Sequence, residues 1–187
     1  MPDQLFRVNR KYAMQLEEVY FWTATVKDWR HLLKPDKYKT IILEVLQELQ
    51  RKSLVRIYGF VIMSNHVHLV WESINKNGRE MPQASFAKAT AHLILEDLKQ
   101  NHPAVLTFFK VKEKERAHRI WQRDPLAILL FSKQMLEQKL QYLHQNPLQE
   151  HWQLADRPEA YQWSSAAYYE TGKKTFDFLT HYQQRMP

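Results

Sequence analysis

Residues 58–72 constrain the fold of this chain more than any other stretch. They read Tyr-Gly-Phe-Val-Ile-Met-Ser-Asn-His-Val-His-Leu-Val-Trp-Glu. Apolar residues on both sides of the polar pair Ser64-Asn65 predict two strands joined by a tight turn. Side chains alternate between the two faces of a strand, so residues 66 and 68 point the same way. The stretch therefore predicts a β-hairpin whose second strand presents His66 and His68 side by side.

Two neutral imidazoles on one rigid strand supply half of a metal site. The chain has no cysteine, so thiolates and disulfides are excluded, and any metal must be held by histidine, carboxylate or amide groups. Taken alone, a His-x-His pair is more often the polar face of a half-exposed strand than a metal site. Both interpretations stay open until the other segments are considered.

The order of the remaining elements predicts an α+β fold. It is strand, helix, strand, strand, helix, strand, which is the ferredoxin-like split βαβ pattern of an antiparallel sheet with helices packed on one face. A third helix and a C-terminal extension follow. The expected strands cover residues 19–26, 55–63, 66–72 and 126–131, and the expected helices cover residues 35–52, 82–100 and 132–146. We expect an N-terminal arm over residues 1–18, one domain over 19–150 and a tail over 151–187 packed on that domain.

The composition narrows the classes of function. With 187 residues the chain is long enough for one domain with a buried core, and three glycines do not provide a glycine-rich phosphate loop. Polar residues interrupt every apolar run, and the first ten residues contain no apolar signal segment, so we expect a cytoplasmic protein without a membrane partner.

Charge and aromatic content favour a nucleic-acid partner. The net charge is +7, and the chain carries six Trp, nine Tyr and nine Phe. Basic side chains bind phosphate backbones, and aromatic faces stack on unpaired bases. The alternative is that the charged residues crowded between positions 110 and 119 only form a solvated surface. The candidate DNA contacts are Lys88, Lys99, Lys110, Lys112, Lys114, Arg116, Arg119 and Trp121, with Trp152 and Trp163 as further stacking candidates.

The third expected helix carries the remaining candidates for chemistry. Leu136, Leu140 and Leu143 form its apolar stripe, and Tyr142 and Asn146 lie four residues apart beside that stripe. The Asn146 amide oxygen is able to serve as a hard metal ligand, and Tyr142 would then lie close to the metal. A packing tyrosine and a helix C-cap before Pro147 are the alternative roles.

Three segments together resemble the REP-associated tyrosine transposases, which belong to the single-tyrosine HUH transposases. The segments are the strand lead-in and His-Val-His at 59–71, the Tyr-Leu-His-Gln-Asn-Pro segment at 142–147, and the Arg-Pro-Glu-Ala-Tyr-Gln-Trp-Ser-Ser segment at 157–165. They occur in the order found in that family. The resemblance spans about residues 19–169, and the three motifs together are far more specific than His-x-His alone.

The resemblance implies a site and a reaction. His66 and His68 match the metal-binding histidines, Tyr142 matches the nucleophile, and Asn146 matches the third ligand, where other members use glutamine. It further implies Mg²⁺ or Mn²⁺, and single-stranded or hairpin DNA that is nicked and rejoined through a 5′-phosphotyrosine. The protein would act as a monomer or a homodimer. The alternatives are a non-enzymatic binder of such DNA on the same fold, a replication initiator or relaxase of the wider HUH group, and a metal hydrolase that uses water.

Overall fold

The computed structural model describes residues 14–113 and 116–187. Most of the predicted N-terminal arm and Lys114 lie outside these ranges. The strands are β1 (Val19–Thr25), β2 (Val55–Ile62), β3 (His66–Ser73) and β4 (Leu126–Leu129). The α-helices are α1 (Asp36–Arg51), α2 (Pro82–Asn101), α3 (Pro103–Leu106), α4 (Lys133–Gln145) and α5 (Ala166–Thr171). Short 3-10 helices are η1 (Lys27–Trp29), η2 (Thr107–Phe109), η3 (Asn146–Leu148), η4 (Pro158–Ala160) and η5 (Tyr182–Gln184).

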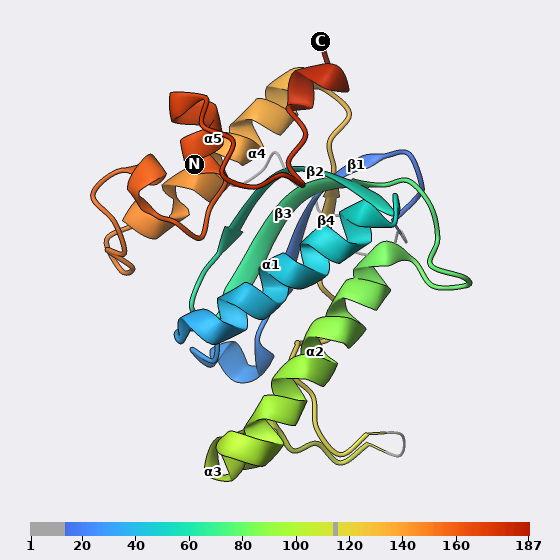
Figure 1. Cartoon of the computed structure of the whole chain (residues 1–187), viewed down its shortest axis with the longest axis vertical. Coiled ribbons are helices and arrows are strands. Elements are labelled where there is room, and N and C mark those ends of the chain that lie inside the picture. The colour runs from blue at the N-terminus through green and yellow to red at the C-terminus, as the bar shows by residue number, and fades with distance from the viewer. Residues whose placement is uncertain (1–13, 114–115) are drawn as a thin grey trace, which may run out of the picture.

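The four strands form one sheet in the order β2-β3-β1-β4, and every neighbouring pair is antiparallel. This is the ferredoxin-like arrangement, in which β3 lies between β1 and β2, so the predicted fold class is confirmed. The two central strands are β3, which carries His66 and His68, and β1, which carries the residues paired with them (Figure 1).

One face of the sheet is covered by α1 and α2. Ile42 and Leu46 of α1 and Phe86 and Ile94 of α2 are fully buried against this face in the larger hydrophobic cluster. These side chains recur at helical spacing, and a helix with one apolar stripe is stabilised chiefly by burying that stripe. The prediction that these two helices share one face is therefore confirmed.

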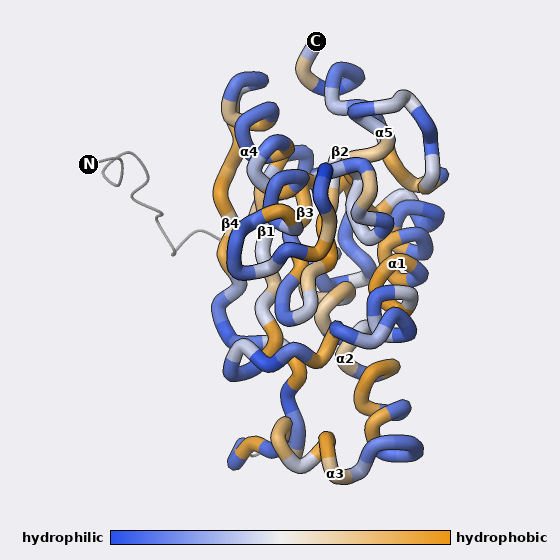
Figure 2. Tube along the Cα trace, turned by 90° about the vertical axis from the view of Figure 1, so that its left-hand side faces the viewer, coloured by the Kyte–Doolittle hydropathy of each residue, from blue (hydrophilic) through white to orange (hydrophobic). Residues whose placement is uncertain are grey.

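The opposite face is covered by α4, which lies across the strands from α1 (Figure 2). Leu136, Leu140 and Leu143 bury the stripe of α4 in a second hydrophobic cluster. Ser132 caps the helix, because its Oγ accepts a hydrogen bond from the Met135 N–H at 3.3 Å. The layers are thus helices, sheet and helix, and α4 places its residues over the same face that carries the two histidines.

Strand β4 ends at Leu129, two residues earlier than predicted. Leu130 is buried and its N–H still donates to the Val19 carbonyl at 2.8 Å, whereas Phe131 is 77% exposed. The chain leaves the sheet here, and Ser132, three residues after Leu129, caps α4. The apolar run in the sequence therefore continues beyond the paired strand.

The C-terminal segment covers the free edge of β2. The Ile62 N–H donates to the Trp163 carbonyl at 2.9 Å, and the Thr180 N–H donates to the Ile57 carbonyl at 2.9 Å. Such cover removes the unpaired edge that otherwise invites association with another chain. Among the described residues, no helix is both long and apolar enough to cross a membrane.

Candidate functional site

The β2–β3 hairpin fixes the positions of the two histidines. The Met63 N–H donates to the His66 carbonyl at 2.8 Å, so Ser64 and Asn65 form the predicted two-residue turn. In the register with β1, Thr25 lies opposite His66 and Thr23 lies opposite His68. The imidazole centroids are 4.5 Å apart, and each histidine is only 6% exposed. The alternation of strand side chains thus brings the two rings together on the face covered by α4.

Hydrogen bonds to the Nδ1 atoms orient both rings. His66 Nδ1 lies 2.6 Å from Asn65 Oδ1, and the Asn65 amide nitrogen donates to the Trp29 carbonyl at 3.3 Å. Since Asn65 Oδ1 only accepts, the His66 proton is on Nδ1 and the lone pair is on Nε2. His68 Nδ1 lies 2.7 Å from Thr23 Oγ1, a hydroxyl that pairs with either tautomer, so Nδ1 of each ring is occupied by a hydrogen bond within the protein. Both rings therefore offer Nε2 to a ligand.

Burial keeps the two imidazoles neutral. Loss of hydration first, and then the nearby His151, lower the pKa of His66 to about 4. The pKa of His68 is also held well below its ordinary value, by burial first and then by the charges of His66 and Lys139. Neutral imidazole is the form that ligates a metal. The site is thus ready to bind a cation at neutral pH without first releasing protons.

Helix α4 brings Tyr142 and Asn146 to the histidines. The Tyr142 ring centroid lies 5.6 Å from that of His68 and 5.8 Å from that of Phe21, and the residue is 51% exposed. Asn146 ends the helix and is only 6% exposed. The sequence separates these residues from His66 by more than 70 positions, and packing of the leucine stripe on the sheet is what joins them. The structure thus brings together all four predicted site residues.

These four residues share one pocket of about 330 Å³. Its lining consists of Thr23, Thr25, Trp29, His66, His68, Tyr142, Asn146, Gln149, His151 and Trp152. Trp29 and Trp152 flank His66, with ring centroids at 6.5 Å and 5.8 Å from its own. Trp152 was a stacking candidate from the sequence, whereas Trp29 gave no sequence signal because the three-residue 3-10 helix η1 is too short for a periodic pattern. The pocket therefore combines side-chain nitrogen and oxygen atoms with aromatic faces.

Lys139 is a neighbour of the tyrosine that the sequence analysis missed. Its ammonium lies 5.1 Å from the Phe21 ring centroid and 5.6 Å from the Tyr142 ring centroid. Partial burial lowers its pKa. The spacing of three residues between Lys139 and Tyr142 puts them on one helix face, which is the signal that would have identified it. A cation at this position favours negative charge on the tyrosine or on a bound phosphate.

Two imidazole nitrogens and one amide oxygen are the atoms that a divalent cation would find here, with coordination positions left open. Two imidazole Nε2 atoms and the buried Asn146 amide are the candidate ligands on the pocket wall. No group of three or more His, Cys, Asp or Glu side chains able to hold a metal occurs within residues 14–113 and 116–187. A cation here would therefore use the amide oxygen, water or a substrate oxygen to complete its shell, as Mg²⁺ commonly does.

The predicted basic DNA contacts lie elsewhere. Lys88 is on α2, where it pairs with Glu80 at 3.3 Å. Arg119 pairs with Glu113 at 2.7 Å and is largely covered. Lys99, Lys110 and Lys112 are exposed on the last turn of α2 and the segment that follows α3 (Figure 1). Trp121 is only 7% exposed and its indole N–H donates to Thr90 Oγ1 at 3.0 Å. None of these residues lines the His66–His68 pocket.

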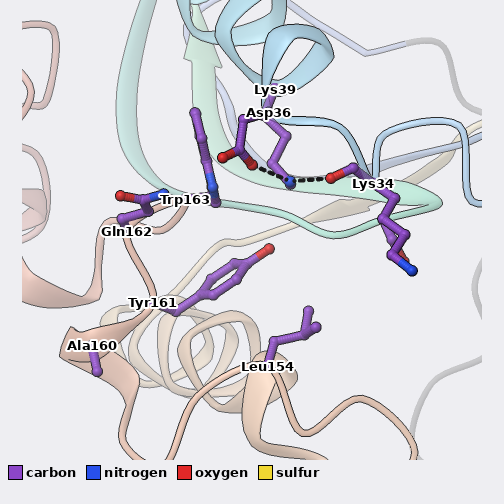
Figure 3. A pocket seen from close by; sticks show the side chains of 9 residues that line it. Lys34, Asp36, Lys39, Leu154, Ala160, Tyr161, Gln162 and Trp163 are labelled. Atoms are coloured by element: carbon purple, nitrogen blue, oxygen red, sulfur yellow. Dashed lines mark hydrogen bonds and ion pairs between the residues drawn. The ribbon is translucent and has the colours of Figure 1, made fainter.

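A second hollow lies on the other side of the hairpin turn. It has a volume of about 290 Å³, and Ser64, two residues before His66, is part of its lining. The buried Lys39 ammonium donates to the Lys34 carbonyl and to Asp36 Oδ1, both at 2.9 Å, on the side opposite Tyr161 (Figure 3). This arrangement fastens the start of α1 beside the turn that positions the histidines.

Comparisons with known proteins identify the fold. The sequence matches no family model and no curated protein. Among solved structures, the fold is similar to that of a REP-associated tyrosine transposase bound to a REP hairpin, with a TM-score of 0.54. The match covers 83% of this chain and 81% of that chain at 15% sequence identity. The resemblance expected from the three sequence segments is thus confirmed at the level of the fold.

Proposed function

We propose that this protein is a metal-dependent transposase or endonuclease that nicks and rejoins single-stranded or hairpin DNA through a 5′-phosphotyrosine. The observation that carries the proposal is the convergence of His66, His68, Tyr142 and Asn146 on one pocket. The solved structure of similar fold is itself bound to a DNA hairpin. A fold alone does not define an activity, so the proposal rests on the residues of the pocket.

The tyrosine would act as the nucleophile. Tyr142 Oη attacks phosphorus, a P–O bond to Oη forms, and the bond from phosphorus to the 3′ oxygen breaks. Tyr142 Oη gives up its proton, the departing 3′ oxygen takes up one proton and leaves as a hydroxyl, and the 5′ phosphate remains on Tyr142. The covalent link retains the phosphodiester bond energy, so a 3′-hydroxyl is able to reverse the step and rejoin strands. A half-exposed tyrosine on the rim of the pocket is accessible to a phosphate from solvent.

The other residues would bind and orient the scissile phosphate. The two Nε2 atoms and the Asn146 oxygen would hold Mg²⁺ or Mn²⁺, which when bound supplies positive charge to a non-bridging phosphate oxygen. The Lys139 ammonium, 5.6 Å from the Tyr142 ring centroid, stabilises charge that develops on the attacking side. Trp29 and Trp152 provide faces on which unpaired bases beside the cleaved bond can stack.

A denaturing gel tests the proposal directly. Hairpin oligonucleotides with single-stranded flanks, taken from DNA that borders the gene, are labelled at the 3′ end and incubated with Mg²⁺ or Mn²⁺. The label should migrate with the protein, because the 5′ phosphate of the 3′ fragment stays attached. Tyr142→Phe should abolish this adduct, whereas Tyr168→Phe should retain it as the matched control. EDTA should also prevent its formation.

The outcomes separate the alternatives. Hairpin binding without any adduct supports a non-enzymatic DNA-binding protein. Cleavage without an adduct supports hydrolysis by water. Cleavage that persists unchanged in Tyr142→Phe contradicts the assignment of the nucleophile.

A further inference from the structure

Two consecutive residues at the rim of the His66–His68 pocket have a strained backbone. Asp28 and Trp29 both have a φ of 56°. Residues other than glycine rarely adopt this left-handed conformation, and a bulky residue such as tryptophan keeps it only where its surroundings hold it there. Such strain is concentrated at functional sites. The contacts that hold Trp29 therefore indicate what this segment does.

The Trp29 backbone is held from β1 and from the hairpin turn. Its N–H donates to the carbonyl of Val26, which follows β1, at 3.0 Å, and its carbonyl accepts from Asn65 Nδ2 at 3.3 Å. The indole is 60% exposed and lies at 67° to the His66 ring, with the centroids 6.5 Å apart. Side-chain packing thus does little to fix Trp29, and its backbone hydrogen bonds do more.

Asn65 binds Trp29 and His66 with the two ends of one amide. Its Oδ1 lies 2.6 Å from His66 Nδ1, and its Nδ2 donates to the Trp29 carbonyl. Asn65 is only 5% exposed, and its own carbonyl accepts from the Val26 N–H at 2.8 Å, which fastens the turn to the segment that carries Trp29. One planar group therefore joins a candidate metal ligand to the strained residue at the rim.

A cation on His66 would act on Trp29 through this amide. Ligation of Nε2 withdraws electrons from the imidazole, so the Nδ1–H becomes a stronger donor to Asn65 Oδ1. Hydrogen bonds in a chain polarise one another, so donation from Asn65 Nδ2 becomes stronger as well. The bond to the Trp29 carbonyl, at 3.3 Å, is longer than the usual value of about 2.9–3.0 Å, so it is able to shorten.

We propose that Asn65 is a positioning residue that couples occupation of the metal site to the order of Trp29. With a cation on His66, the amide holds Trp29 in its strained conformation and its indole face is presented to the substrate. Without the cation, the segment leaves that conformation more often. The coupling is reciprocal, so a substrate that holds Trp29 in place tightens cation binding by the same factor. This inference rests on the proposed function, because it takes His66 as a metal ligand and Trp29 as a stacking face.

Nuclear magnetic resonance of the full chain without DNA gives the direct test. Zn²⁺ is the probe, because it is diamagnetic and imidazole nitrogen is one of its usual ligands. The Trp29 indole N–H signal is assigned by its loss in Trp29→Phe, and the His66 ring signals by their loss in His66→Gln. Zn²⁺ should shift the His66 ring signals and raise the heteronuclear NOE of the Trp29 indole N–H, because a held ring moves less on the picosecond to nanosecond timescale.

Asn65→Asp separates the two ends of the amide. A carboxylate oxygen still accepts from the His66 Nδ1–H, but a carboxylate cannot donate to the Trp29 carbonyl. Zn²⁺ should therefore still shift the His66 ring signals, whereas the Trp29 NOE should no longer rise. Asn75→Asp is the matched control with the same change in charge, because Asn75 Nδ2 donates to the Ser53 carbonyl at 3.0 Å beyond the other end of β3. It should respond like the parent protein.

A cycle of variants tests whether Asn65 acts on DNA binding through Trp29. The affinity for a single-stranded oligonucleotide is measured with and without Mg²⁺ in the Tyr142→Phe background, so that the strand is not cut. Asn65→Asp should reduce the gain in affinity from Mg²⁺ by about 2-fold to 12-fold, which corresponds to one hydrogen bond. In a Trp29→Ala background, Asn65→Asp should reduce this gain much less.

The inference is overturned if Zn²⁺ shifts the His66 ring signals of the parent protein while the Trp29 NOE stays unchanged, a result that does not depend on whether Asn65→Asp folds. It is also overturned if Asn65→Asp keeps the rise in the NOE, or if it reduces the gain from Mg²⁺ equally with and without the Trp29 indole. If Zn²⁺ does not shift the His66 signals, the metal site of the proposed function is removed instead. Absence of the Tyr142-dependent adduct removes the proposed nucleophile and leaves the coupling in place.

Discussion

Replacement of Gly59 by alanine should displace the tyrosine helix from the sheet. A register shift between Ile57 and Gly59 makes Tyr58 and Gly59 both face α4. A Cβ at position 59 would overlap Leu140 Cδ2 and would lie 3.3 Å from Ser165 Oγ. Glycine is therefore required here for close approach of the helix and not for an unusual backbone conformation.

The surroundings leave the added methyl group little room. Leu140 is only 4% exposed, so most of its side chain is packed against other groups, although part of it lines a pocket of about 290 Å³. Ser165 Oγ is held at 2.9 Å by the Phe60 N–H and lies 2.8 Å from His144 Nε2. Overpacking a core lowers the free energy of unfolding by about 1–3 kcal/mol. Replacing glycine by alanine raises it by about 0.4–1 kcal/mol, because the unfolded chain then has less conformational entropy to lose. We expect a net loss of about 1–2 kcal/mol.

Activity should fall more than stability. Tyr142 lies two residues beyond Leu140 on α4, so a shift that relieves the overlap also moves the tyrosine. A misplacement of about 1 Å at a reacting group can reduce a rate about 100-fold. Urea unfolding gives the change in stability, and the rate of adduct formation under fully folding conditions gives the change in activity.

A double-mutant cycle isolates the overlap. Leu140→Ala alone should destabilise by about 2–5 kcal/mol because it leaves a cavity under α4. Combined with Gly59→Ala it removes the overlapping methyl group, so the double variant should be at least about 1 kcal/mol more stable than the sum of the single effects. Strict additivity, or a Gly59→Ala variant with unchanged stability and adduct rate, would refute the reasoning.

Three further predictions follow from buried polar groups. Burial lowers the pKa of His144 to about 4 from its ordinary value of 6.5, so the unfolded chain takes up the proton first as pH falls and stability is lost between pH 6.5 and 4. Between pH 7 and 5 the His144→Gln variant should lose about 2 kcal/mol less than the original in urea unfolding, and equal slopes would contradict this. The Glu72 carboxylate is 2% exposed and accepts hydrogen bonds from the Tyr58 hydroxyl at 2.6 Å and from Arg185 Nε at 3.1 Å. Glu72→Gln should therefore lower the free energy of unfolding by about 1–3 kcal/mol and hasten proteolytic release of the C-terminal segment. The control variant Glu170→Gln should do neither. Asn146→Leu should weaken Mn²⁺ binding by at least about tenfold, because loss of even an outer partner of a metal site has that effect. Electron paramagnetic resonance measures the Mn²⁺ affinity. An unchanged affinity would remove Asn146 from the ligand set.

The sequence by itself determined the hairpin, the order of the elements and the facing of His66 and His68. These follow from local rules, because strand alternation and helical spacing are properties of neighbouring residues. The pairing of Tyr142 with Asn146 on one helix face is of the same kind. The division into an arm, a domain and a tail remains a prediction.

Only the tertiary structure decided which groups meet. No local pattern states that α4 packs on the face opposite α1 and α2, since an apolar stripe shows that a face is buried but not against which surface. That choice puts Tyr142 near His68, and it depends on the space left by Gly59. Tertiary packing likewise places Trp29 beside His66, and the packing of α2 on the sheet brings Gln83 to one pocket with Trp22. Their meeting is determined by packing between segments far apart in the chain, where side-chain shape and volume decide the outcome.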